Sequence, residues 1–194
     1  AVVFIGVLFR LSRISEAFLI LRASDLGLAL AMAPLVLVLM NVVYSAGAYP
    51  AGIISDRVSP KHLLLAGVVT LAGSHLILAY ANGLPAVFVG IGLWGVHMAL
   101  TQGILARLVA DTAPTRLIGS AFGMFNLMTG VALLLASVAG GLLWDTIGPR
   151  ATFFTAAGFA SASGLILLGK DFPGAGAGNN SARTSGSAAR HQPD

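Results

Sequence analysis

Charged side chains are scarce in this sequence. They make up only 9% of its 194 residues, whereas hydrophobic residues make up 57%. An ordinary soluble domain carries roughly 25% charged residues, because a water-soluble core of this size needs a polar shell. The shortage of charge therefore excludes an ordinary soluble domain and predicts a protein embedded in a lipid bilayer.

Several other features are missing. The chain has no cysteine, which excludes disulfides and thiolate metal sites. Its formal net charge is +4, but the bases are spread thinly between apolar runs and form no stripe for nucleic acid. No glycine-rich phosphate loop with a lysine follows a strand, so ATP hydrolysis has no support. We expect no cofactor, no metal and no nucleic-acid partner.

The N-terminal region also lacks the order of a secretory signal, in which a charged stretch precedes a short apolar run. Here the apolar run AVVFIGVLF comes first and Arg10, Arg13 and Glu16 follow it. The sequence does not begin with Met and starts within a hydrophobic run. We therefore expect the chain to be part of a longer protein.

Long hydrophobic segments fill most of the chain. A helix needs about 20 apolar residues to cross the hydrocarbon core, and the runs show no period-two alternation typical of barrel strands. After Lys170 the composition changes to small and polar residues, which predicts a disordered cytoplasmic tail over 171–194. Residues 1–170 should form a bundle of six transmembrane helices, at about 1–22, 29–51, 62–82, 86–108, 118–143 and 150–169.

The distribution of bases predicts the orientation of the bundle. Basic residues favour cytoplasmic loops, and seven of them fall on one side of the predicted topology against two on the other. We therefore expect both chain ends to lie in the cytoplasm. The two sets are Arg57, Lys61, Arg107, Arg116, Lys170, Arg183 and Arg190 on the first side, and Arg22 and Arg150 on the second.

A short pattern occurs twice. GIISDRVSPK at 52–61 and GLLWDTIGPR at 141–150 both read Gly, two branched aliphatics, any residue, Asp, any residue, Val or Ile, a small residue, Pro and a base. The copies lie three predicted helices apart, so they should lie on opposite faces of the membrane, as in the inverted repeats of secondary transporters. Two similar turns that arose independently are the alternative, since Gly, Asp and Pro are common in turns.

The first copy of this pattern resembles the loop signature of the major facilitator superfamily. It has Gly52, Asp56, Arg57 and Lys61 at the matching positions, although Ser59 and Pro60 stand where the family usually has Gly and a base. The resemblance covers nearly all of residues 1–170 and corresponds to helices seven to twelve of such a transporter. It also rests on the segments at 95–103, 113–114, 119–123 and 140–145.

The resemblance implies half of a major-facilitator fold: an all-α membrane protein whose six helices form two inverted three-helix repeats. It implies secondary active transport of a small solute by alternating access, with a proton as a candidate coupling ion and a missing N-terminal six-helix half as partner. Asp56 would meet a helix of that half and act as a latch, since a carboxylate is favourable at a helix N-terminus. A solvated turn residue that caps its own loop is the alternative.

Three charges lie inside the first predicted span, where an unpaired charge is expensive. At helical spacing Arg10, Arg13 and Glu16 fall on one broad face, which must look at water or at a partner. We interpret this face as the wall of a cavity that carries solute charge or a proton-coupling carboxylate. The alternative is a buried Arg–Glu pair that only fixes helix packing.

Further polar residues within predicted spans are candidates for the same cavity: Asn41, Tyr44, His97, Gln102 and Asn126. Polar side chains in membrane helices more often bond across helices than line a pathway, and we interpret His75 in this way. His97 with Gln102 is the strongest exception, because histidine can titrate near neutral pH.

Two other functions are compatible with six membrane helices. An intramembrane serine protease needs a Ser nucleophile and a His on a facing helix, but Ser74 and His75 are adjacent on one helix, so we expect no enzyme. A non-transporting membrane scaffold or partner subunit stays an alternative. We expect an integral membrane protein of the bacterial inner membrane.

Overall fold

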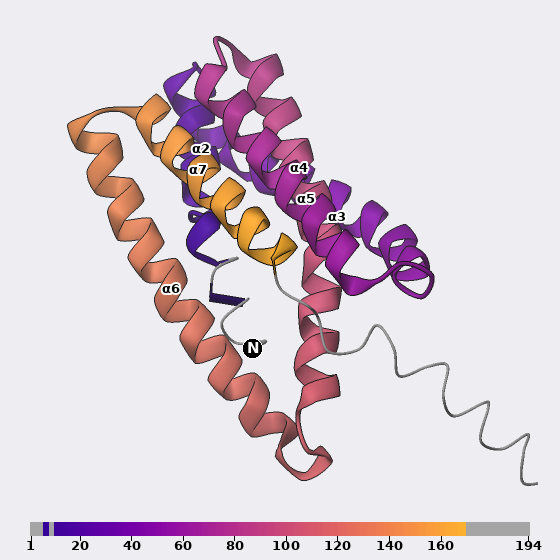
Figure 1. The fold of residues 1–194 in the computed structure, drawn as a ribbon. Helices are drawn as coiled ribbons and strands as arrows, with labels where there is room; N and C mark the ends of the chain where they lie inside the picture. Colours follow the sequence, from indigo (N-terminus) through magenta and orange to yellow (C-terminus); the bar gives the residue numbers. More distant parts are fainter. Residues whose placement is uncertain (1–5, 8–9, 170–194) are drawn as a thin grey trace, which may run out of the picture.

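The computed structural model describes residues 6–7 and 10–169, and in this part of the chain it is helical without any strand. Residues 6–7 and 10–12 are helical, and short 3-10 turns at Leu30–Met32 and Thr115–Leu117 precede two of the long helices. The all-α fold class predicted from the sequence is confirmed. The helices, labelled as in Figure 1, are α2 (Ala17–Asp25), α3 (Ala33–Ser55), α4 (Pro60–Tyr80), α5 (Leu84–Thr112), α6 (Ile118–Thr146) and α7 (Pro149–Leu168).

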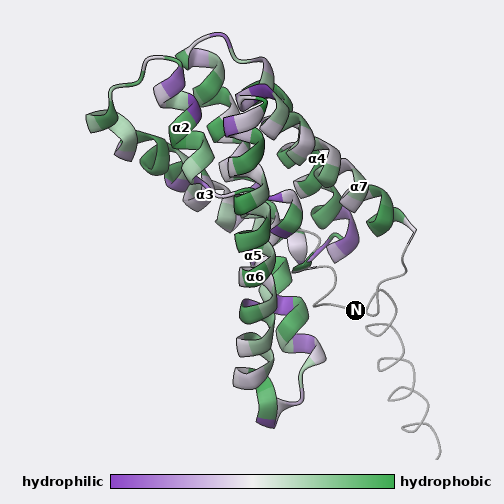
Figure 2. Cartoon of the chain, turned by 90° about the vertical axis from the view of Figure 1, so that its left-hand side faces the viewer, coloured by the Kyte–Doolittle hydropathy of each residue, from purple (hydrophilic) through white to green (hydrophobic). Residues whose placement is uncertain are grey.

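Five of the described helical segments are long and apolar enough to cross a membrane, namely those that contain α3 to α7. Hydrophobic residues predominate along them (Figure 2). Helices α5 and α6 have 29 residues each, which corresponds to about 44 Å, whereas the hydrocarbon core is about 30 Å thick. Their joined ends therefore project beyond the rest of the bundle, as both views show (Figures 1 and 2).

The first predicted span, 1–22, falls partly on residues 1–5 and 8–9, which lie outside the described residues. In the described part, the prediction of one continuous helix is wrong. The helix is interrupted over residues 13–16, and α2 then continues to Asp25. Side chains satisfy the interrupted backbone: the Ser15 hydroxyl accepts from the amide of Ala17 at 3.3 Å, and His75 bonds the carbonyl of Ser12 at 3.1 Å.

The core forms where α4 packs against α5 and α7, and where α5 packs against α3. Glycines allow the closest approaches. A Cβ at Gly95 of α5 would lie 2.7 Å from the carbonyl oxygen of Met40 on α3, and a Cβ at Gly67 of α4 would overlap Thr101 on α5. Close packing through small residues is typical of membrane helices, because van der Waals contact replaces the hydrophobic drive.

Helices α3 and α6 are the least buried of the five long helices. Large apolar side chains along both of them stay exposed, including Val38 and Val42 on α3 and Leu127, Leu134 and Leu142 on α6. In water such faces would be unfavourable, so they must contact lipid or another apolar bundle. The fold therefore presents extended apolar surfaces on α3 and α6. Each of these is the second helix of one three-helix repeat.

The two copies of the repeated pattern, at 52–61 and 141–150, occupy equivalent places in the two three-helix repeats. Pro60 is the first residue of α4 and Pro149 the first residue of α7, and proline suits this position because the first turn needs no N–H. The α3–α4 and α6–α7 connections lie at opposite ends of the bundle (Figure 1). This placement agrees with the inverted orientation expected from the sequence. The predicted tail over 171–194 lies outside the described residues.

Candidate solute cavity

A cavity of about 160 Å³ lies between the first helical segment, α5 and α6. It brings together five residues that the sequence analysis singled out from three separate helices. Its lining residues are Arg10, Arg13, His97, Thr101, Gln102, Leu105, Ala106, Phe122, Phe125 and Asn126.

Arg13 is held on two sides. Its guanidinium forms an ion pair with Glu16 three residues later, and its Cζ lies 5.8 Å from the centre of the Trp94 ring. Trp94 is fully buried on α5. A cation over an indole face is attracted by the ring quadrupole, so the carboxylate and the ring together fix the position of this buried arginine.

Arg10 lies one turn earlier and lines the same cavity. Its side chain is half-buried, and among the described residues it has no ion-pair or hydrogen-bond partner. Because Glu16 is already bonded to Arg13, the positive charge of Arg10 is not balanced within the described part of this chain. The cavity wall is therefore electropositive.

His97 is buried at the closest approach of α4 and α5. Its Nδ1 lies 2.8 Å from the carbonyl oxygen of Gly67, and since a carbonyl can only accept, Nδ1 must carry the proton. The Thr101 hydroxyl in turn donates to the carbonyl of His97 at 2.8 Å. The bond to Gly67 orients the imidazole while leaving it at the cavity wall, and the bond from Thr101 involves only the backbone of His97.

Three candidates do not line this cavity. The Glu16 carboxylate is directed to Arg13, although its side chain is 37% exposed. Asn41 is exposed and donates from its side-chain amide to the carbonyl of Leu37 at 2.8 Å. Tyr44 lines a separate cavity of about 110 Å³ between α3 and α5, near Gly52. The rotation of α3 about its axis determines that Asn41 and Tyr44 face away from this cavity.

Behind the cavity, polar groups fasten the interrupted segment to α4 and α7. The hydroxyl groups of Ser12 and Ser163 lie 2.6 Å apart, and His75 bonds the Ser12 carbonyl. The ring of His75 also meets Trp94 edge-on, with 5.3 Å between centroids. His75 joins two helices here, as we expected for it.

The residues of the loop signature, 52–61, make separate contacts at the C-terminal end of α3. Asp56 lies 3.8 Å from Arg107 on α5, and Arg107 also approaches Asp111 at 3.6 Å. All three side chains are more than half exposed, so these pairs are weak in isolation. Lys61 donates to the carbonyl of Leu168 at 2.9 Å and thereby caps the end of α7.

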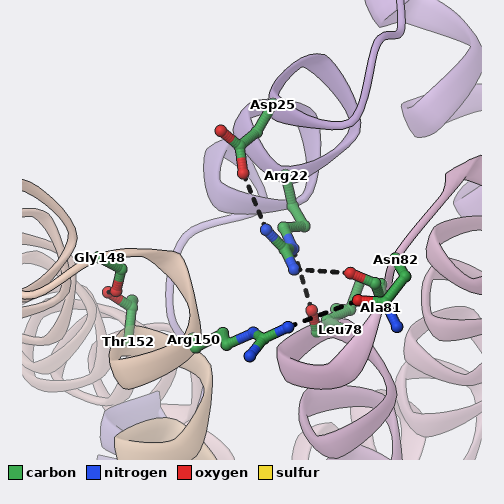
Figure 3. A network of polar contacts seen from close by, with 8 residues as sticks. All are labelled: Arg22, Asp25, Leu78, Ala81, Asn82, Gly148, Arg150 and Thr152. Carbon is green, nitrogen blue, oxygen red and sulfur yellow. Dashed lines mark hydrogen bonds and ion pairs between the residues drawn. The ribbon is translucent and has the colours of Figure 1, made fainter.

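Arg22, which the distribution of bases places in a loop, is instead the centre of a buried polar network that the sequence did not predict. Arg22 is buried, and its guanidinium donates to the carbonyls of Leu78 at 3.0 Å and Ala81 at 2.8 Å (Figure 3). Asp25 holds it from the other side at 2.8 Å. The signal in the sequence was the Arg–Asp spacing of three residues, which brings the two side chains together on a helix.

Comparisons with known proteins agree with this architecture. The profile of the Major Facilitator Superfamily matches residues 2–192. An uncharacterized MFS-type transporter of Methanocaldococcus jannaschii is 31% identical over 172 residues, which are 86% of this chain and 43% of the relative. The chain belongs to the Major Facilitator Superfamily and is an integral membrane protein of a transporter family.

Further relatives include a dipeptide transporter and a tetracycline resistance protein. The lysosomal dipeptide transporter of Gallus gallus is 30% identical over 66% of this chain and 30% of its own length. The class B tetracycline resistance protein of Escherichia coli is 28% identical over 67% of this chain and 31% of its own length. The chain thus spans less than half the length of these relatives.

Among solved structures, the POT family transporter PepTSo shares the fold. It superposes with a TM-score of 0.70 at 15% identity, over 86% of this chain and 36% of that structure. This likeness concerns the arrangement of the helices.

Proposed function

We propose that this chain is the C-terminal six-helix half of a secondary transporter, which moves a small solute across the membrane by alternating access. The observation that carries the proposal is the cavity. In a chain with 9% charged residues, two arginines, a histidine and two amides converge on one space within the bundle. Polar groups inside a membrane protein are expensive and mark pathways or binding sites.

The apolar faces of α3 and α6 support a second six-helix half. They come from equivalent places in the two three-helix repeats, and the chain covers only 43% of the M. jannaschii relative. A second bundle against these faces would close the open side of the cavity. Substrate contacts would then come from both halves, with Arg10, Arg13, His97, Gln102 and Asn126 supplied by this one.

The proposal includes six spans, of which the first is the interrupted segment that ends with α2. The interruption leaves peptide groups and charges within the membrane, which is tolerated where the backbone lines a cavity. From the distribution of bases we propose that both ends lie in the cytoplasm, in a bacterial inner membrane. We propose no enzymatic activity, and a proton as the candidate coupling ion.

The loop residue Asp56 would act as a latch between the two halves. Its pair with Arg107 at 3.8 Å is exposed, so the carboxylate can exchange this partner for the N-terminus of a helix in the other half. Such a contact would form in one state of the transporter and break in the other.

Alternating access can be tested by thiol labelling, because the chain contains no cysteine. The full-length protein, with cysteines elsewhere removed, receives a single cysteine at Gln102 in the cavity. A matched control carries it at Arg116, in the exposed turn before α6, which stays on one side of the membrane. We expect a membrane-impermeant reagent to reach Gln102→Cys from either side of the membrane, with opposite changes of the two rates when a solute gradient is imposed.

The Arg116→Cys control should react from one side only and should be insensitive to the gradient. Flux of labelled solutes in proteoliposomes completes the test. A folded protein whose Gln102→Cys reacts from one side only, and which moves none of the solutes tested, would refute transport and favour the scaffold alternative.

A further inference from the structure

We infer that the transported solute is a small organic anion, and that Arg10 binds its carboxylate. The inference rests on the proposed function, since it names the solute class of the same cavity. The inference is based on the charges of the cavity lining. Arg10 lines the cavity and has no ion-pair or hydrogen-bond partner among the described residues, and no carboxylate belongs to the lining.

The acidic residues of the described part are engaged elsewhere or lie far along the helices. Glu16 is bonded to Arg13, Asp25 to Arg22, and both Asp56 and Asp111 approach Arg107. The remaining one, Asp145, lies in the last turn of α6, about five turns of helix from Asn126. Among the described residues, the cavity lining therefore contains two guanidinium groups and no carboxylate, and the Glu16 carboxylate is bonded to Arg13.

A guanidinium is the side chain best suited to a carboxylate. Its planar N–H groups match the two oxygens, and it stays charged at any physiological pH. Since an unpaired charge in the membrane interior is costly, binding an anion relieves a cost that the empty cavity carries. A cation would meet the opposite field and be repelled.

The remaining wall suits an organic molecule. Gln102 on α5 and Asn126 on α6 present amide groups, which can donate N–H to carboxylate or hydroxyl oxygens. Leu105, Phe122 and Phe125 add an apolar surface on the same cavity. A solute with a carboxylate and an apolar body would use both parts, whereas an inorganic anion would leave the apolar wall unfilled.

The binding test uses the purified full-length protein in detergent. A panel of two- to ten-carbon compounds contains equal numbers of carboxylates, their neutral amides and the corresponding amines. Thermal stabilisation is measured for wild type, Arg10→Gln, Arg10→Lys and the control Arg116→Gln, whose arginine lies in the exposed turn before α6. We expect stabilisation by carboxylates and by neither amides nor amines.

For a carboxylate that stabilises the wild type, Arg10→Gln should weaken the affinity about tenfold or more. Arg10→Lys should retain part of the binding and Arg116→Gln all of it. The unliganded Arg10→Gln protein should melt at or above the wild-type temperature, because it loses no partner and no longer carries the cost of an unpaired charge. If the other half supplied an acid to Arg10, this variant would melt lower and anions would not bind, which overturns the inference.

Three other results would also overturn the inference of an anionic solute. Amines or amides alone could stabilise the protein, no carboxylate could stabilise it, or carboxylates could stabilise Arg10→Gln as much as the wild type. Exchange of the bound compounds in proteoliposomes separates the two proposals. If the protein exchanges only neutral or cationic solutes, the transporter proposal is supported and the inference of an anionic solute is refuted. Arg10-dependent carboxylate binding without exchange supports the anion site and removes the transport function.

Discussion

Replacing Arg22 by glutamine should destabilise this bundle more than any change to an exposed base. Arg22 is 5% exposed and donates to the carbonyls of Leu78 and Ala81, where α4 ends. The last carbonyls of a helix have no partner within it, so the guanidinium satisfies groups that are otherwise buried and unpaired. The ion pair with Asp25 keeps it in place.

The magnitude follows from these contacts. A hydrogen bond to a charged group contributes about 1.5–3 kcal/mol, so the loss of two such bonds to carbonyls costs about 3–6 kcal/mol before relaxation. Asp25 is 45% exposed on its side chain, and water can replace its lost partner at little cost. Partial repair by the glutamine amide, which can reach one carbonyl, reduces the expected loss to about 2–4 kcal/mol.

The assay is thermal and denaturant unfolding of the full-length protein in detergent, for Arg22→Gln and for the control Arg150→Gln. Arg150 belongs to the same cluster (Figure 3), but its bond to Asn82 is long, 3.4 Å, and exposed. The control should lose less than about 0.5 kcal/mol. Equal stability of the two variants would refute the capping role, and Arg22→Lys should fall between them because an ammonium cannot span both carbonyls.

Three further predictions concern transport and topology. Glu16→Gln, Arg13→Gln and the double variant should all fold and all lose or alter uptake, whereas a pair that only fixes packing would give unstable single variants and a double variant with wild-type uptake. Asp56→Asn should slow transport several-fold at nearly normal expression, and a parallel loss of expression would indicate a folding role instead. Cysteines placed at Ser59 and Gly83 should label from opposite sides of the membrane; labelling from the same side would contradict the proposed topology.

The sequence predicted the all-α membrane fold because hydropathy is a local property. Segments of about 20 apolar residues can satisfy their backbone in lipid only as helices, whatever packs against them. Pro60 and Pro149, at matching positions of the repeated pattern, begin α4 and α7, within two residues of the predicted starts at 62 and 150. The family followed from residues that are contiguous in the chain, such as Gly52 and Asp56.

The interruption over 13–16 was not predictable from the first segment itself. Its apolar run and its charges read as one helix, since a broken helix is stable only when other elements bond the released peptide groups. Here His75 of α4 and Ser163 of α7 hold the Ser12 region. These residues follow Ser12 by 63 and 151 positions, and no local pattern connects them.

The sequence by itself determined that this protein lies in a membrane, that it is helical, and that Arg10, Arg13 and Glu16 are charges within a hydrophobic segment. The tertiary structure decided which of them meet. It joined Arg10 to Gln102 and Asn126 across one cavity, turned Asn41 and Tyr44 away from that cavity, and buried Arg22 beneath the end of α4. The physical reason is that composition fixes what a helix can bury, whereas the rotation of each helix about its axis is set by packing between segments far apart in the chain.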